Sequence, residues 1–371
     1  MKLKKFSFVL VGRTVSTGMQ GLFYIIFAFI LGPESFGNLS YIISLAGVVG
    51  IISRFGLNQT VVVHQAKNNL MLVNQINLLA IIMISFGSVI LLFIDIFAAL
   101  LCLAGTFFIM NIHNQLGIKQ YKKFFLLNIS KGILIIIFPI IFYSFFELYG
   151  IIIGMSIGYL FCCFNFFRTI KLNFQFELLR KNFKVILHNF GADTSSRLTQ
   201  YVDKLMIAPI LGFSSLGIYQ LNLQILLALE VLPLGLNSFL LSEEASGEKH
   251  KKISLLVIAS SIIIVISVIL LAPYFISVFF SEFVEGVLDL QIIIISLIPL
   301  TIASILNAKL QARESTKIGY SAIIRIGILL GLIFVLGSTY GTIGLSFAVL
   351  ISTITYTIFL FVVYKIENSE N

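Results

Sequence analysis

The sequence predicts an all-α integral membrane protein, with about 12 transmembrane helices in two six-helix bundles related by a parallel repeat. Three observations predict this fold class: the apolar composition, a series of long apolar segments, and a motif that occurs twice. Of the 371 residues, 58% are hydrophobic and 11% are charged, and the mean hydropathy is +1.05. Soluble domains carry about 25% charged residues, so we expect lipid to be the solvent of this chain.

The apolar segments predict the spans and their grouping. A bilayer is crossed by about 20 mostly apolar residues. Twelve segments qualify: 8–31, 37–62, 73–93, 96–112, 124–145, 149–167, 186–211, 216–240, 253–280, 287–307, 318–338 and 341–364. The longest break lies in the middle of the chain, so we expect an N-terminal six-helix bundle over 1–170, a cytoplasmic linker over 171–184 and a C-terminal six-helix bundle over 185–371.

The basic residues predict the orientation. If the N-terminus is cytoplasmic, 19 of the 25 Lys and Arg residues lie in segments on the inside, and the other six lie within spans. The turns on the opposite face carry acidic residues instead, namely Glu34, Asp95, Glu147, Glu282 and Glu285. By the positive-inside rule, both termini are therefore expected in the cytoplasm. The net charge of +9 is then a signal of topology and not of nucleic-acid binding.

A glycine-containing turn occurs twice at a spacing of 180 residues. LGPESFGNLSY at 31–41 aligns with LGFSSLGIYQL at 211–221, so that Gly32 matches Gly212 and Gly37 matches Gly217. A second pair of motifs, YGIIIGMS at 149 and YGTIGLS at 340, opens the last span of each half. The copies lie an even number of spans apart, so both halves enter the membrane in the same direction. This indicates a parallel repeat.

Polar side chains form a stripe upstream of each copy of the turn. In the first span the stripe is Arg13, Thr17, Gln20 and Tyr24, and in the seventh it is Asp193, Arg197, Gln200 and Lys204. This spacing places each set on one face of a helix. Charged residues at bilayer depth usually face a cavity or a partner. We therefore predict a polar, net basic cavity that suits an anionic head group such as a phosphate or pyrophosphate.

Site residues follow from these stripes. We assign substrate binding to Arg13, Gln20, Arg197, Gln200 and Lys204. Two alternatives stay open, because Arg13 could extend to the lipid head groups and Arg197 could simply neutralise Asp193 one turn before it.

Two acidic residues are candidates for ion coupling, Asp193 and Glu230. Glu230 lies in the middle of LLALEVLPLGL, where its carboxyl group could instead bond backbone groups freed by Pro233. The four His and three Cys residues show no ligand spacing, so we expect no metal and no cofactor.

The repeated turns, the YG motifs and the basic start of the first span resemble the Wzx-type polysaccharide flippases, of the superfamily that includes the MATE exporters. The resemblance implies a non-enzymatic transporter of the bacterial inner membrane. It implies alternating-access transfer of an undecaprenyl-pyrophosphate-linked oligosaccharide from the cytoplasmic to the periplasmic leaflet, for O-antigen (lipopolysaccharide) or capsule synthesis. The implied partners are this lipid-linked substrate, membrane lipids, a polysaccharide polymerase and a chain-length regulator.

Two other functions are weighed against this one. A cation-coupled multidrug exporter of the same fold would favour an acidic residue inside the first bundle, and spans 1 to 6 contain no Asp or Glu within the membrane. A membrane polysaccharide polymerase would need a sizeable external loop with catalytic residues. The longest outward connection is 281–286, which contains no His or Arg.

Overall fold

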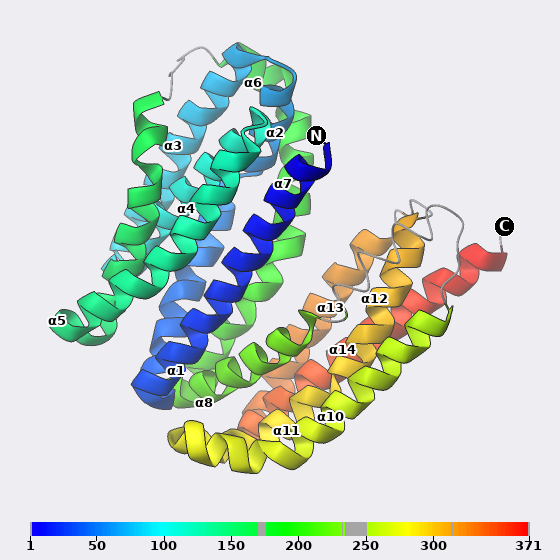
Figure 1. The fold of residues 1–371 in the computed structure, drawn as a ribbon. Coiled ribbons are helices and arrows are strands. Elements are labelled where there is room, and N and C mark those ends of the chain that lie inside the picture. The colour runs from blue at the N-terminus through cyan, green and yellow to red at the C-terminus, as the bar shows by residue number, and fades with distance from the viewer. Residues whose placement is uncertain are drawn as a thin grey trace. The chain divides into compact units, whose positions relative to one another are not determined.

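The computed structural model describes residues 2–169, 176–231, 233, 251–312, 315 and 317–369. These residues form helices joined by short turns (Figure 1). Among them, eight helical runs are long and apolar enough to cross a membrane. The predicted all-helical membrane class is therefore confirmed. Residues 171–175 of the predicted linker and 234–240 of the predicted eighth span lie outside the described part of the chain.

Within the described ranges, most neighbouring helices are separated by only a few residues. In order, they are α1 (Lys2–Arg54), α2 (Leu57–Ala66), α3 (Leu70–Leu92), α4 (Ile96–Gly117), α5 (Tyr121–Thr169), α6 (Glu177–Lys181), α7 (Phe183–Arg197), η1 (Leu198–Gln200), α8 (Val202–Leu229), α10 (Lys251–Phe279), η2 (Ser281–Gly286), α11 (Val287–Ile295), α12 (Leu297–Ala312), α13 (Ile318–Leu332), the π-helical η3 (Ile333–Gly337) and α14 (Ser338–Ser369).

The repeated turn is a one-residue break within a helical run. The break in α1 is at Gly32, with φ 68° and ψ 174°, and the break in α8 is at Gly212, with φ 85° and ψ 172°. Essentially only glycine adopts this conformation, which explains why glycine stands at both positions. Pro33 follows the first break, where its fixed φ suits the first residue of a new helical segment. In Figure 1, α1 folds back on itself at its lower end.

The YG motifs also lie beside breaks, but in a different register. The chain breaks at Phe146 and Glu147 in α5, before Tyr149, and at Gly341 in α14, after Tyr340. Glu147 (φ 49°, ψ −133°) and Gly341 (φ 60°, ψ −138°) nevertheless share one backbone conformation. The two halves thus turn in the same way here, with glycine at only one of the two positions.

Contacts divide the chain into two compact units. Unit 1 comprises Met1–Tyr24 and Tyr41–Val202, and unit 2 comprises Ile25–Ser40 and Asp203–Asn371. In unit 1, α4 packs on α3 and α5, and α2 packs on α4 and α7; in unit 2, α14 packs on α11, α12 and α13. Helix α7, which we assign to the C-terminal bundle from the sequence, packs in unit 1. The bundle boundary at 171–184 remains a prediction.

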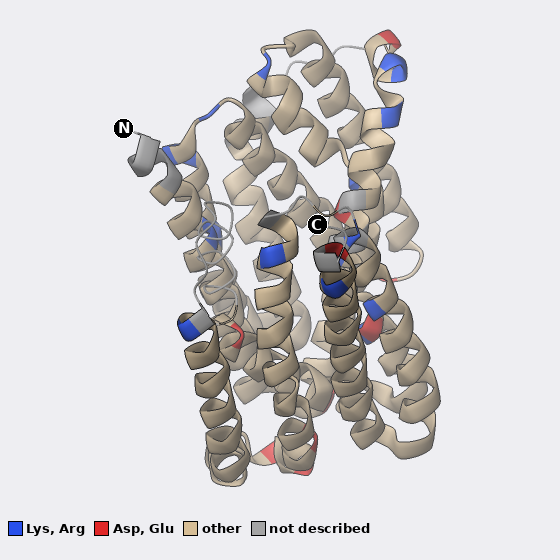
Figure 2. Ribbon diagram, turned by 90° about the vertical axis from the view of Figure 1, so that its right-hand side faces the viewer, with Lys and Arg blue, Asp and Glu red and all other residues tan. Residues whose placement is uncertain are grey.

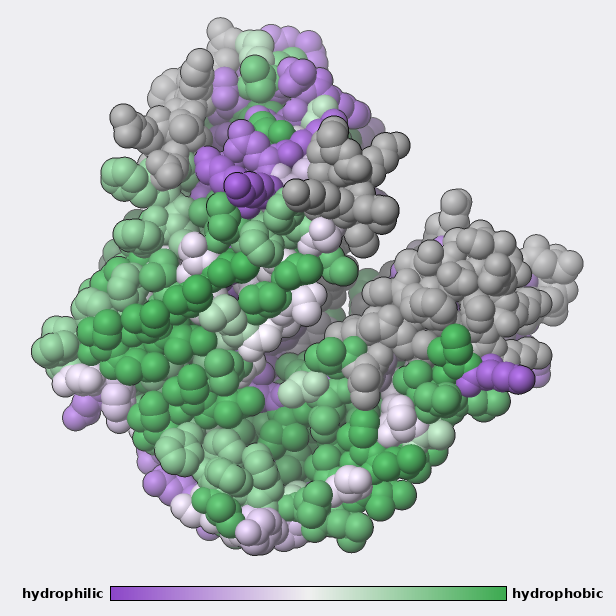
Figure 3. All heavy atoms as spheres, in the orientation of Figure 1, coloured by the Kyte–Doolittle hydropathy of each residue, from purple (hydrophilic) through white to green (hydrophobic). Residues whose placement is uncertain are grey.

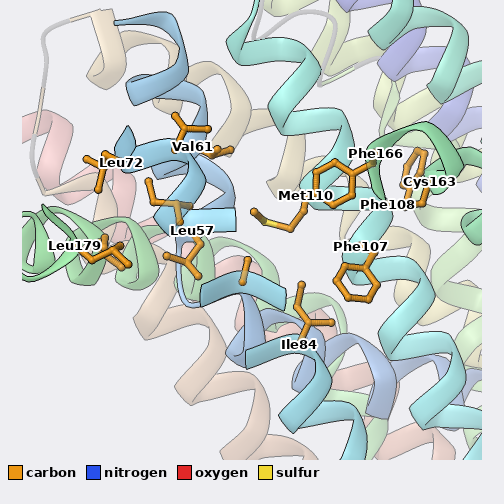
Figure 4. Close-up of a cluster of buried hydrophobic side chains, with 14 of the residues drawn as sticks. Leu57, Val61, Leu72, Ile84, Phe107, Phe108, Met110, Cys163, Phe166 and Leu179 are labelled. Carbon is orange, nitrogen blue, oxygen red and sulfur yellow. The ribbon is translucent and has the colours of Figure 1, made fainter. Parts of the chain in front are cut away.

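A cluster of buried apolar side chains joins the helices of unit 1 (Figure 4). Leu57 and Val61 of α2, Leu72 of α3, Met110 of α4 and Phe166 of α5 all belong to it. Lipid tails are as apolar as these side chains, so close packing and polar contacts must hold such helices together. Polar contacts of this kind form the candidate site below.

Much of the described outer surface is apolar. In Figure 2 long lengths of helix carry no charged residue, and Figure 3 shows broad hydrophobic areas below a hydrophilic upper end. Large side chains such as Phe86, Phe145, Phe161 and Leu270 are largely exposed. Such a surface suits contact with lipid.

Candidate functional site

The predicted seventh span is not a single helix. Helix α7 ends at Arg197, the 3-10 turn η1 follows, and α8 begins only at Val202. Tyr201, with φ −130° and ψ −34°, departs from α-helical backbone angles. The spacing of the second polar stripe therefore does not place its members on one continuous helix face. Asp193, Arg197 and Gln200 belong to unit 1, and Lys204 belongs to unit 2.

Asp193 lies between two guanidinium groups of unit 1. Arg197 Nε donates to Asp193 Oδ1 at 2.8 Å, and Arg54 Nη2 donates to Asp193 Oδ2 at 3.5 Å. The side chains of Arg54 and Asp193 are only 4% and 2% exposed, whereas that of Arg197 is 38% exposed. Arg54 Nε has no hydrogen-bond partner among the described residues. The cluster therefore has two cations, one anion and one accessible guanidinium.

Arg54 lies within the predicted span 37–62, but it is not among the residues assigned to the site from the sequence. Its contact with Asp193 spans 139 positions, and helical periodicity cannot report a contact between distant segments. One signal was available: an unpaired Arg in span 2 and an acidic residue in span 7 are complementary charges. The pairing of Asp193 with Arg197, which the sequence leaves open as mutual neutralisation, is present in the structure.

The other residues predicted in unit 1 are more dispersed. Arg13 is exposed, with its guanidinium carbon 5.9 Å from the centre of the Phe124 ring. Gln20 is half-buried and Gln200 is exposed. Of the predicted binding residues in this unit, Arg197 is thus the one that belongs to the ion-pair cluster. The substrate-binding role of the other three remains a prediction.

A buried lysine of unit 1 makes a polar contact between two helices that the sequence did not reveal. Lys131 of α5 is buried, and its Nζ donates to Ser16 Oγ of α1 at 3.2 Å. The ring of Tyr159 lies 6.0 Å from the same ammonium group. Lys131 lies within the predicted span 124–145, and in the structure its hydrogen bond to Ser16 links α5 to α1.

Lys204 pairs with its neighbour in unit 2. Its Nζ lies 3.1 Å from Asp203 Oδ1, although adjacent side chains on a helix usually point apart. Tyr219 donates its hydroxyl to Asp203 Oδ2 at 2.9 Å, and all three residues are buried. The pair lies in the first turn of α8.

Glu230 lies at the end of α8 and is half-buried. Its backbone N–H still bonds the Leu226 carbonyl at 2.9 Å, so the helical pattern reaches this residue. Arg325 of α13 is within electrostatic range of Glu230 and of Tyr219. The Arg325 guanidinium also stands 5.3 Å from the Tyr356 ring centre. Glu230 thus belongs to a polar region that the sequence alone did not assemble.

The N-terminal part of the chain matches a protein family. Residues 2–145 match the family described as polysaccharide biosynthesis protein. Over nearly the full length, the chain is 26% identical to an uncharacterized membrane protein of Methanocaldococcus jannaschii, with 97% of each chain covered.

Solved structures of transporters share the fold. An inward-facing multidrug resistance MATE family transporter of the MOP superfamily matches with a TM-score of 0.70 at 17% identity, covering 95% of this chain and 94% of its own. The lipid II flippase MurJ, in an inward closed conformation, matches with a TM-score of 0.64 at 17% identity, covering 98% and 87%. A MOP superfamily transporter from Pyrococcus furiosus matches with a TM-score of 0.58 at 17% identity, covering 99% and 96%. This chain therefore has the all-helical membrane fold of the MATE and MurJ transporters.

Proposed function

We propose that this protein is a flippase of polysaccharide synthesis, which moves a lipid-linked oligosaccharide between the leaflets of the cytoplasmic membrane by alternating access. The match of residues 2–145 to the polysaccharide biosynthesis family supports the pathway. The fold shared with the lipid II flippase supports a lipid-linked substrate. The resemblance of the repeated turns and YG motifs to Wzx-type flippases implies the finer points of this proposal: an undecaprenyl-pyrophosphate carrier, a bacterial inner membrane, and O-antigen or capsule as the product.

The Arg54–Asp193–Arg197 cluster carries the proposal. It has a net positive charge, and its one accessible group is the Arg197 guanidinium. A guanidinium forms paired, charge-assisted hydrogen bonds with phosphate oxygens. In this proposal Arg197 binds the substrate phosphate, Asp193 orients Arg197, and buried Arg54 fixes Asp193. Lys204, held by Asp203, supplies a second cation, and Arg13, Gln20 and Gln200 contact the hydrated part of the substrate.

Ion coupling is assigned to Glu230 in preference to Asp193. Two guanidinium groups within salt-bridge distance balance the charge of Asp193, so this carboxylate serves to orient Arg197. Glu230 is half-buried at a helix end and is not in a direct ion pair among the described residues. Replacing Glu230 with Gln should slow transport driven by an ion gradient. Equal rates for wild type and Glu230→Gln would remove Glu230 from the mechanism.

The proposed topology has twelve spans, with both termini in the cytoplasm. Breaks at Gly32, Glu147, Gly212 and Gly341 divide four long helical runs at places that match predicted turns. Reporter fusions at Lys119 and Glu282 should lie on opposite sides of the membrane. Fusions that report the same side would contradict this topology.

Complementation tests the proposed function. A strain that lacks this protein should lose surface polysaccharide and accumulate lipid-linked repeat units on the cytoplasmic leaflet. Wild type should restore the surface glycan, and the double variant Arg197→Ala, Lys204→Ala should not. Lys181→Ala is a matched control, because Lys181 is an exposed cation of unit 1 that pairs only locally with Glu177. Normal surface glycan in the double variant, at matched expression, would contradict the phosphate role.

Multidrug export is the second candidate, favoured by the TM-score of 0.70 to a multidrug MATE transporter. The same strains distinguish it. A multidrug exporter would lower the accumulation of cationic dyes and leave the surface glycan unchanged when deleted.

A further inference from the structure

Asp289 of unit 2 is a buried carboxyl group that has no role in the proposed substrate site. It lies in the first turn of α11 and is 2% exposed. Neither Oδ1 nor Oδ2 accepts a hydrogen bond of ordinary geometry from the described residues. The side-chain hydroxyl groups of Thr342 and Ser346 lie in the first turns after the Gly341 break of α14. They are close enough to influence the charge state of the Asp289 carboxyl group.

The other described carboxyl groups differ from Asp289. Asp193 has two arginines, Asp203 has a lysine and a tyrosine hydroxyl, and Glu230 has Arg325 within electrostatic range. Glu282 and Glu285 of η2 are exposed to the surroundings. Among the residues that the structure describes, Asp289 is thus the fully buried carboxyl group without a basic partner.

The elements packed against α11 bring no charge to Asp289. Helices α10, α12 and α14 and the turn η2 pack on α11, and Asn222 of α8 donates to the Gly286 carbonyl at 3.1 Å. Their described titratable groups are Asp203, Lys204, Tyr219, Lys252, Tyr274, Glu282, Glu285, Lys309, Tyr340, Tyr356, Tyr364, Lys365 and Glu367. Among the described residues, none of these forms an ion pair or a hydrogen bond with the Asp289 carboxyl group.

An isolated carboxylate in an apolar interior is so unfavourable that the group takes up a proton or a cation. A hard cation needs about six oxygen ligands, and among the described residues Asp289 belongs to no group of three or more His, Cys, Asp or Glu side chains that could hold a metal ion. A proton needs no ligand set, and a neutral carboxylic acid can donate to a hydroxyl oxygen.

We propose that Asp289 is a proton-binding site of unit 2, occupied in this conformation and emptied when water reaches the first turn of α11 during the transport cycle. The acid O–H bond then breaks, the proton passes to water as hydronium, and the carboxylate is left hydrated. This proposal rests on the proposed transport function for its role, because coupling requires a transported substrate. The proton site itself does not depend on the identity of that substrate.

Infrared spectroscopy of the purified full chain in lipid tests the site without substrate. The carbonyl-stretch band of a protonated carboxylic acid should appear at neutral pH in wild type and disappear in Asp289→Asn. Glu285→Gln is the matched control, since it removes an exposed acid four residues earlier and should leave the band in place. Replacing sodium with choline should not change it. A band that Asp289→Asn leaves intact, or one that sodium abolishes, overturns the proposal.

Two further measurements test the site even if Asp289→Asn folds poorly. Ser346→Ala removes one hydroxyl beside the carboxyl group and should shift the band while retaining it; an unshifted band contradicts the assignment. Raising the pH should lower the melting temperature of wild type more than that of Asp289→Asn, because the wild type would then bury an unpaired charge. Equal pH profiles would count against the site.

A transport assay in proteoliposomes distinguishes a failure of the proton site from a failure of the proposed flippase function. If wild type moves a lipid-linked oligosaccharide in proteoliposomes, Asp289→Asn should lose the dependence of the rate on a pH gradient. Unchanged dependence overturns the coupling role while the flippase function stands. Failure of wild type to move the substrate, with the acid band present, overturns the proposed function and leaves the proton site.

Discussion

Gly37 and Gly217 pack reciprocally within unit 2. A Cβ atom added to Gly37 would overlap the carbonyl oxygen of Phe213, and a Cβ atom added to Gly217 would overlap the carbonyl oxygen of Pro33. Each oxygen belongs to the residue four positions before the other glycine. The two copies of the repeated turn therefore meet through matching surfaces, where only glycine allows the backbones to come so close.

Alanine at either glycine should destabilise unit 2. Gly37→Ala or Gly217→Ala places a methyl group against backbone atoms, which cannot rotate away as a side chain can. We expect a clearly lower melting temperature. It is measured in detergent as the fraction of protein that remains in the folded size-exclusion peak after heating. The double variant should lose less than the sum of the two, because one separation of the backbones relieves both overlaps.

Gly331→Ala is the control for these variants. No described atom lies within 4 Å of a Cβ at Gly331 in α13, and alanine in a helix is favoured over glycine by about 0.5–1 kcal/mol. Its melting temperature should be unchanged or higher. A loss as large as that of Gly37→Ala would show that the effect is not specific to the reciprocal contact.

Gly212→Ala should isolate the cost of the backbone break. The added methyl group meets no described atom within 4 Å, so only the unusual φ and ψ oppose it. Such strain costs about 1–3 kcal/mol. Gly32→Ala should cost a similar amount, because the methyl group would meet only the end of the exposed Glu282 side chain, which can rotate away. Melting temperatures of both variants, with and without Glu282→Ala, check this; a large recovery of the Gly32 variant on removal of Glu282 would contradict it.

Arg54→Leu should lower stability more than Arg197→Ala. Removing one partner of a buried ion pair costs about 3–5 kcal/mol, because the other charge stays buried without compensation. In that variant Asp193 keeps its ion pair with Arg197 but loses the buried guanidinium of Arg54, and the partial exposure of Arg197 makes the loss of Arg197 less costly. Thermal unfolding of purified variants measures both.

The double variant Arg54→Leu, Asp193→Leu tests whether the cost of Arg54→Leu comes from leaving Asp193 without its buried partner. It removes the buried charges together and should recover part of the stability that Arg54→Leu loses. A double variant less stable than either single variant would contradict the ion pair.

His64 should make the protein sensitive to mild acid. Burial, followed by the charge of Lys67, lowers the pKa of His64 below its ordinary value of about 6.5. The unfolded chain therefore takes up a proton at a higher pH than the folded chain, and stability falls as pH drops below about 6.5. His64→Gln should reduce this fall between about pH 7 and 5 in melting-temperature measurements. An identical pH profile for the variant would exclude His64 as the cause.

The sequence predicted the helical membrane class because composition and segment length report it directly. The repeat was visible as well, since Gly32 and Gly212 are needed for the same backbone conformation. The register of the second motif was not, because Glu147 adopts in α5 the conformation that Gly341 adopts in α14. Because a residue other than glycine adopts this conformation at one of the two breaks, glycine in the sequence does not mark both of them.

The candidate site was only partly predictable. The pair of Asp193 and Arg197 follows from their spacing, whereas the contact of Asp193 with Arg54 depends on how distant helices pack. The interruption at η1 also escaped prediction, because LTQ contains neither glycine nor proline. Asp289 lies near the start of the predicted span 287–307, and its burial follows from the packing of α11 on α14, which the sequence does not report.

The contact of Gly37 with Gly217 has the form of an isologous interface, in which one surface meets a second copy of itself. In a homodimer each substitution at such a contact occurs twice, so both sides change together. Here the two copies belong to one polypeptide, and a substitution alters one side alone. The two halves can therefore acquire different sequences, such as Pro33 opposite Phe213, while the close approach of their backbones is kept.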